Sequence, residues 1–155
     1  VLFALLIISA LGSSAINAVI AIGITFAPGM ARVSRSITLT VREQDYVAAA
    51  VARGEGAAWI ILREIAPNIL APVIVESTIR VAFAIMLLAT LSFLGMGAQP
   101  PSPEWGLMIS DARAHLYRSP WPVIAPGVAI ATVAVAFNLL GDGLRDVLNP
   151  RVQGG

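Results

Sequence analysis

The chain has 155 residues, of which 57% are hydrophobic and 12% are charged, and its mean hydropathy is +0.84. Ten basic and nine acidic residues cannot cover the surface of a soluble domain of this length, because such domains carry about a quarter charged residues. The net charge of +1, with arginine as the only basic residue besides one histidine, argues against a nucleic-acid partner. Cysteine is absent, which excludes disulfides, thiolate metal sites and a cysteine nucleophile.

The chain begins inside an apolar stretch, 1–11, that has no basic flank before it and no cleavage site after it. It therefore does not match a cleavable signal peptide. As a helix, VLFALLIISA would measure about 15 Å, half of the roughly 30 Å thickness of a bilayer core. We therefore expect a partial span at 1–11 and a domain that is incomplete at its N-terminus. A turn at Gly12-Ser13-Ser14 separates it from a second predicted span at 15–31.

Two more spans are predicted further along the chain. The uncharged run 81–103, with the preceding turns, predicts a span at 72–95. Another uncharged run, 119–141, predicts a span at 120–140, with its prolines in the opening turns, where a helix tolerates them best. The expected fold is all-α: a single polytopic membrane domain over 1–155, with about three full transmembrane helices and a truncated one.

The charged residues lie between and after these spans. The segment 32–68 carries five arginines against four acids, and the tail 141–155 carries Arg145 and Arg151. By the positive-inside rule, the loop 41–67 and the tail face the cytoplasm, and the loop 98–118 lies outside. An even number of crossings separates the two cytoplasmic segments, so this topology is self-consistent.

Two short helices are predicted in the loop 41–67. Thr40-x-x-Glu43 is a capping-box pattern, so a helix is expected to start there. Arg53 suits the C-terminal end of that helix, and Gly54 can adopt the left-handed conformation that ends it. A second short helix is expected to follow and to stop at Pro67.

This helical hairpin has two interpretations on physical grounds. The small residues 48–50 on its first arm can fit closely into a groove on another protein, which favours a docking element. The apolar residues 59–62 on its second arm are also typical of a hairpin that lies on the membrane surface. Composition and spacing leave both open.

The loop resembles that of the permease subunits of binding-protein-dependent ABC importers, which carries the pattern E-A-A-x-x-x-G followed later by I-x-L-P. Four backbone-shaping positions match: Ala49, Ala50, Gly54 and Pro67. Three positions depart from the pattern: Ala48, Glu64 and Ala66. The stretches LSFLGMGAQPPSPEWG at 91–106 and GDGLRDVLNPR at 141–151 resemble the peptide and nickel branch of that family.

The resemblance implies a transmembrane permease subunit of an ATP-driven importer for peptides or related small solutes, in the bacterial cytoplasmic membrane. The implied partners are ABC ATPase subunits, a homologous second permease and an extracytoplasmic substrate-binding protein. ATP hydrolysis is expected in the ATPase subunits, because this chain has no lysine for a phosphate-binding loop, so it is expected to be neither an enzyme nor a cofactor binder. The implied ATPase-coupling residues are Tyr46, Ala49, Ala50, Gly54 and Pro67.

Polar residues within the predicted spans are candidates for the translocation path: Asn17, Glu76, Arg80 and Asn138. Glu76 and Arg80 lie four residues apart on one helix face, so they could equally pair with each other near the cytoplasmic boundary. The two asparagines could instead link helices through hydrogen bonds. His115 is the only histidine and has no ligand spacing around it. The alternative function is an ATP-independent secondary transporter or a channel-like protein, with Glu76 and Arg80 relaying an ion.

Overall fold

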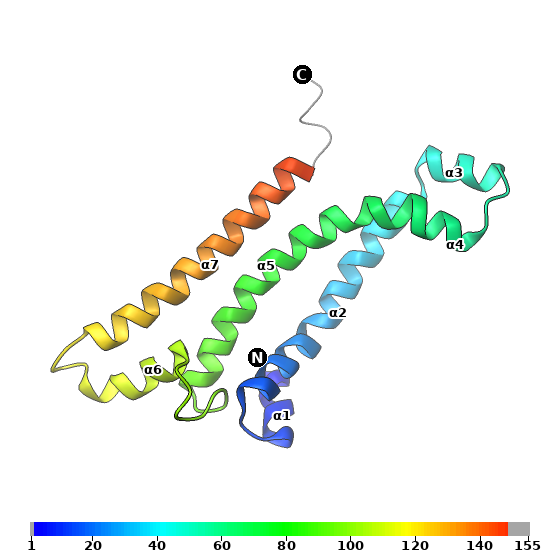
Figure 1. Cartoon of the computed structure of the whole chain (residues 1–155). Coiled ribbons are helices and arrows are strands. Elements are labelled where there is room, and N and C mark those ends of the chain that lie inside the picture. The colour runs from blue at the N-terminus through cyan, green and yellow to red at the C-terminus, as the bar shows by residue number, and fades with distance from the viewer. Residues whose placement is uncertain (1, 149–155) are drawn as a thin grey trace. The chain divides into compact units, whose positions relative to one another are not determined.

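A computed structural model describes residues 2–148, and within that range every regular element is a helix (Figure 1). The elements are α1 (Leu2–Leu11), α2 (Ala15–Arg42), α3 (Asp45–Ala52), α4 (Ala57–Trp59), the π-helix η1 (Ile60–Ile65), α5 (Ala66–Phe93), α6 (Trp105–Ala112), the 3-10 helix η2 (Arg113–His115) and α7 (Trp121–Leu148). The predicted all-α class is therefore confirmed.

Three helical stretches are long and apolar enough to cross a membrane: Ala15–Arg42, Ala57–Phe93 and Trp121–Val147. The first helix, α1, has only 10 residues and remains short of a full span at 1.5 Å per residue. The structure thus has the predicted set of three long helices and one short one. α2 and α7 continue beyond residues 31 and 140, so the bilayer boundaries within them remain predictions.

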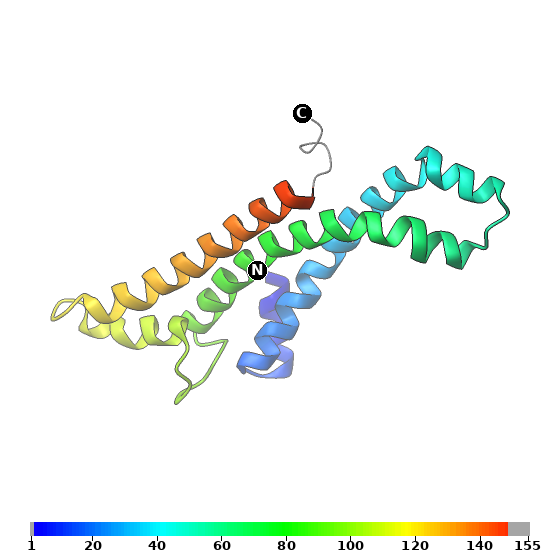
Figure 2. The ribbon, with the colours of Figure 1, turned by 45° about the horizontal axis from the view of Figure 1, so that its top comes forward.

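The chain forms two compact units, the first of which comprises residues 1–27 and 79–138. Its buried core joins α1, the start of α2 and the end of α5 through Ala4, Ile8, Ala18, Ala21, Ile22 and Leu91. Three of these residues are alanines, whose small side chains let helix backbones approach closely. Figures 1 and 2 both show α1 folded back along the first turns of α2.

The same unit contains the segment 94–104 and α6, as well as most of α7. α6 lies against α5 at Gly106, where an added Cβ would come within 2.3 Å of the backbone oxygen of Ala89. Only glycine allows this approach. A cavity of 280 Å³ lies beside the contact, lined by apolar residues of α5 and α7 and by Pro103, Glu104 and Trp105.

The second unit comprises residues 28–78 and, within the described range, 139–148. Its centre is a helical hairpin, defined here as residues 45–65, in which α3 is the first arm and α4 with η1 is the second (Figure 2). The second arm continues into α5 without a break, so helical structure runs from Ala57 to Phe93. Val47, Ala50 and Ile65 are the buried residues of the hairpin.

Two details of the sequence-based prediction for this unit were wrong. Thr40 does not start a helix, because it lies inside α2, where its hydroxyl donates to the Ser36 carbonyl oxygen at 3.2 Å. The first arm starts at Asp45, after Gln44 in an extended conformation. Pro67 does not stop the second arm either, because it lies in the first turn of α5.

The π-helix η1 explains how helical structure passes through Pro67. Backbone hydrogen bonds in a π-helix join residues one position further apart than in an α-helix. The backbone N–H of Ala66 accordingly donates to the Ile61 carbonyl oxygen. Proline lacks an N–H group and its ring crowds the carbonyl one turn earlier. A change of helical register just before the proline displaces those carbonyls, so the missing donor does not end the helix.

Candidate functional site

The turn of the hairpin follows from a Schellman motif at the end of α3. The Gly54 N–H donates to the Val51 carbonyl at 2.9 Å, and the Glu55 N–H donates to the Ala50 carbonyl at 3.3 Å. Gly54 has φ +79°, the left-handed conformation that glycine adopts at little cost. The predicted role of Gly54 as the residue that ends the first arm is therefore confirmed.

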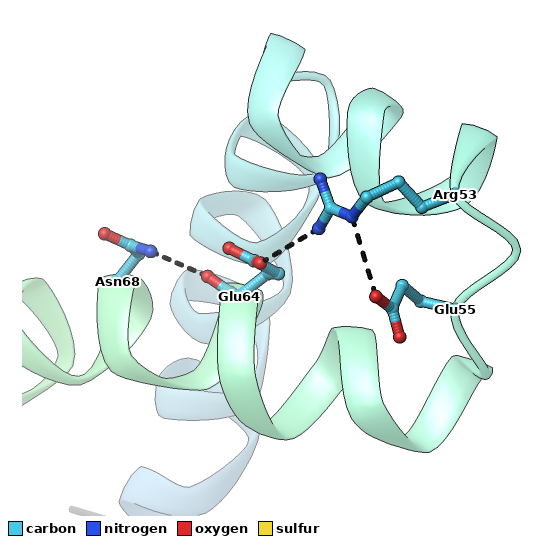
Figure 3. A network of polar contacts seen from close by, with 4 residues as sticks. All are labelled: Arg53, Glu55, Glu64 and Asn68. Atoms are coloured by element: carbon cyan, nitrogen blue, oxygen red, sulfur yellow. Dashed lines mark hydrogen bonds and ion pairs between the residues drawn. The ribbon is translucent and has the colours of Figure 1, made fainter.

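A chain of polar contacts joins the two arms of the hairpin (Figure 3). The Nε of Arg53 lies 3.5 Å from Oε1 of Glu55, and its terminal nitrogen lies 3.8 Å from Oε1 of Glu64. The Glu64 backbone oxygen accepts a hydrogen bond from the Asn68 amide at 2.6 Å. Because the Arg53 side chain is 53% exposed, each ion pair contributes under about 1 kcal/mol.

The first arm presents one face inward and another outward. Val47 and Ala50 are buried, whereas Tyr46 and Ala49 are exposed. Among the predicted coupling residues, Tyr46, Ala49, Gly54 and Pro67 thus share the exposed surface of the hairpin and its junction with α5, and Ala50 packs inside. The arrangement offers a surface of small side chains on a short, fixed helix, which suits close contact with another protein.

The two asparagines predicted within spans both bond to backbone. The Asn17 amide donates to the carbonyl oxygens of Leu11 and Gly12, each at 2.9 Å, and so ties the end of α1 to α2. The Asn138 amide donates to the Ala134 carbonyl at 3.0 Å within its own helix. Asn17 thus links two helices, as the packing role requires, whereas the Asn138 bond stays within α7 and links no second helix.

Glu76 and Arg80 both lie on α5, are half-buried, and each interact with other groups. Arg80 lines a cavity of 340 Å³ whose other walls are apolar side chains of α2 and α5, among them Phe26 and Leu88. It is the only charged residue in that lining. Glu76 does not line this cavity.

A second polar arrangement, which the sequence did not reveal, lies where α5 ends. The hydroxyl of Ser92 is fully buried and donates to Oε2 of Glu104 at 2.6 Å, while it accepts from the Ala98 N–H at 3.3 Å. Ser92 and Glu104 are twelve residues apart, so no local spacing rule pairs them. In the sequence, the stretch 91–106 stands out only through its resemblance to the peptide and nickel branch.

The loop 98–118 contains a short helix, α6, followed by η2, and Glu104 is the residue that precedes α6. Trp105 and His115 are both exposed, and the described residues contain no group of side chains that could hold a metal ion. Within residues 2–148, no side-chain contact of His115 indicates a site.

Within the part of the chain that the structure describes, three long apolar helices, a helical hairpin with a glycine joint and a buried apolar core define a polytopic membrane protein. The chain belongs to the family described as binding-protein-dependent transport system inner membrane component, which matches residues 1–154. The family predicted from the resemblance is therefore confirmed.

Two kinds of relatives are similar to the chain over nearly its whole length. It is 45% identical over 153 residues to the dipeptide transport system permease protein DppC of Alkalihalophilus pseudofirmus, a match of 99% of this chain and 50% of that protein. It is 42% identical over 154 residues to the glutathione transport system permease protein GsiD of Escherichia coli O1:K1 and of Shigella flexneri serotype 5b, covering 99% of this chain and 51% of each relative. The chain spans about half the length of these curated relatives.

Proposed function

We propose that this chain forms part of the membrane subunit of an ATP-driven importer of peptides in the bacterial inner membrane, and that its hairpin couples the subunit to ABC ATPases. Family membership and the relatives named for dipeptide and glutathione transport support this function. The hairpin with its glycine joint argues against the ATP-independent carrier, because a carrier that uses no ATPase needs no element that docks on one. Substrate import and ATP hydrolysis belong to the assembled transporter, in which the ATPase subunits carry the catalytic groups.

The observation that carries the coupling role is the geometry of the hairpin. The Schellman turn at Gly54 fixes how the first arm leaves the joint, and the second arm is continuous with α5. A push on the exposed face around Ala49 is therefore transmitted to a membrane helix through hydrogen-bonded backbone. Closure of the ATPase dimer shifts the equilibrium between the inward-open and outward-open states of the transporter. The size of that shift equals the difference in docking free energy between the two states.

The docking interpretation competes with a hairpin that lies on the membrane. Ile61 and Leu62 are 53% and 72% exposed on the second arm, as an interfacial helix would also show. The two interpretations differ in what covers the first arm, because an ATPase groove encloses Ala49 whereas a lipid surface leaves it accessible to water.

Single-cysteine labelling distinguishes them, because the chain contains no cysteine of its own. Ala49→Cys and Tyr117→Cys would be made in the assembled transporter, Tyr117 being fully exposed in the predicted outer loop. A membrane-impermeant maleimide should label Tyr117→Cys in intact cells, and Ala49→Cys only in inverted vesicles stripped of the ATPases. Labelling of Ala49→Cys that is unaffected by the ATPases would contradict docking, and labelling from outside would contradict the topology.

For the translocation path, we propose Arg80 as a lining residue, supported by its place in the wall of the 340 Å³ cavity. Glu76 stays a candidate on the same helix. The bonds from Asn17 to the end of α1 support a packing role for that residue, and Asn138 stays a candidate for either role.

A further inference from the structure

The segment 94–104, together with the first turn of α6, is called here the outer segment. It begins with a second Schellman turn, in which the Gly95 N–H donates to the Ser92 carbonyl at 3.0 Å and the Met96 N–H donates to the Leu91 carbonyl at 2.8 Å. Gly95 has φ +80°. The chain therefore reverses at the end of α5 and passes back over Ser92.

Because the chain reverses at Gly95, the Ser92 side chain lies close to Gly97, Ala98 and Glu104. Its hydroxyl donates to Glu104 at 2.6 Å and accepts from the Ala98 N–H at 3.3 Å. At Gly97, an added Cβ would lie 1.9 Å from the Ser92 hydroxyl oxygen. A buried hydroxyl without such partners is costly, and a short bond to a carboxylate is among the stronger hydrogen bonds in proteins. The hydrogen bond between Ser92 and Glu104 thus ties the far end of residues 94–104 to α5.

What the pair holds in place is a stiff, exposed surface. Residues 99–103 are all exposed and include three prolines, whose fixed φ angles restrict the backbone. Rigid surfaces lose little conformational entropy when they bind a partner. The segment can keep this advantage only if its ends stay fixed relative to α5.

We propose that Ser92 and Glu104 are positioning residues that hold the outer segment in the form that receives the substrate-loaded binding protein. The proposal rests on the proposed function, in which this segment lies outside the membrane. Neither residue needs to touch the binding protein. Glu104 acts as a hydrogen-bond acceptor for Ser92, and its negative charge is not what the partner recognises.

The test uses the assembled transporter in proteoliposomes, with ATPase rate measured against the concentration of loaded binding protein. In Glu104→Ala, the half-saturating concentration should rise on the order of tenfold, as expected for the loss of one hydrogen bond to a charged group, with the maximal rate nearly unchanged. In Ser92→Ala it should rise at least as much, because the Ala98 N–H also loses its acceptor. Glu104→Gln keeps an acceptor oxygen and should stay within about threefold of the parent protein. Ser102→Ala, an exposed serine on the same segment, is the matched control and should change nothing.

The outcomes separate the alternatives. A parent transporter that needs neither ATP nor a binding protein would refute the proposed function, whereas a working parent with unshifted Glu104→Ala would refute the positioning role alone. Glu104→Gln as impaired as Glu104→Ala would show that the charge itself is recognised, and would also overturn the proposal. If Ser92→Ala fails to assemble, the comparison of the two Glu104 variants still decides.

A double variant adds an independent readout. Ser92→Ala combined with Glu104→Ala should be no worse than Ser92→Ala alone, because Ser92→Ala already removes the bond between the two residues as well as the bond from the Ala98 N–H. Additive losses would mean that the two residues act separately, which contradicts a positioning pair.

Discussion

Replacing Gly54 with valine isolates the effect of the backbone conformation of the hairpin joint. Gly54 has φ +79°, and no heavy atom lies within 4 Å of the position that a Cβ would take. The Cβ that the substitution adds therefore meets no steric clash. Its cost is the left-handed backbone itself, about 1–2 kcal/mol for an L-residue, which lowers the population of the turn by a factor of about 5–30.

We expect Gly54→Val to insert and assemble normally but to transport less substrate per ATP hydrolysed, since the first arm no longer leaves the joint at a fixed angle. Gly54→Asn should be intermediate, because asparagine tolerates the left-handed region better than valine. Gly56→Ala is the matched control, because Gly56 has φ −69° and equally open surroundings.

The assay is substrate uptake and phosphate release measured together in proteoliposomes. Equal coupling ratios for Gly54→Val and Gly56→Ala would refute the reasoning from φ. Loss of membrane insertion in Gly54→Val would also refute it, because the joint would then be needed for folding and not specifically for coupling.

Three further predictions follow from packing and polar contacts. Gly106→Ala should prevent stable assembly, because its Cβ would meet a backbone oxygen at 2.3 Å, whereas Gly127→Ala, with open space around it, should assemble normally. Co-purification with the ATPases measures the assembly of both variants, and equal yields would contradict the close contact. Asn17→Ala, which loses two bonds to the end of α1, should speed proteolysis near residue 12 by up to about 30-fold, on the basis of about 1 kcal/mol for each bond. Asn138→Ala, which loses one bond within its own helix, should leave that cleavage unchanged. Glu64→Gln should lower thermal stability by less than about 1 kcal/mol, because the ion pair is exposed; a larger loss that salt does not reproduce would indicate a stronger role.

Local rules predicted those features of the hairpin that depend on local backbone chemistry. Arg53 and Gly54 sit where a helix end needs them, and the structure has the turn there. The prediction that a helix starts at Thr40 was wrong because a capping-box pattern is also compatible with the interior of a helix, and α2 continues past Thr40. The prediction that the second arm stops at Pro67 was wrong because the hydrogen bonding changes to π-helical just before it. That change removes the usual clash between the proline ring and the carbonyl one turn earlier.

The outer segment shows what sequence reasoning could not reach. Ser92 lies within an apolar run and Glu104 beyond a stretch of prolines, so each has a plausible local explanation. Only the reversal at Gly95 brings them together. The positions that a Cβ atom would take at Gly97 and Gly106 are likewise close to atoms of α5. Such contacts are known only from the folded structure.

The three long apolar helices bury little of their own surface within the chain: 17%, 11% and 11% of their most apolar windows. Each helix satisfies its backbone hydrogen bonds internally and is a stable unit in lipid before it meets another helix. Insertion and helix association are therefore separate stages, and a variant such as Gly106→Ala is expected to pass the first and fail the second. Its product would be a chain that is correctly inserted in the membrane but whose helices do not associate.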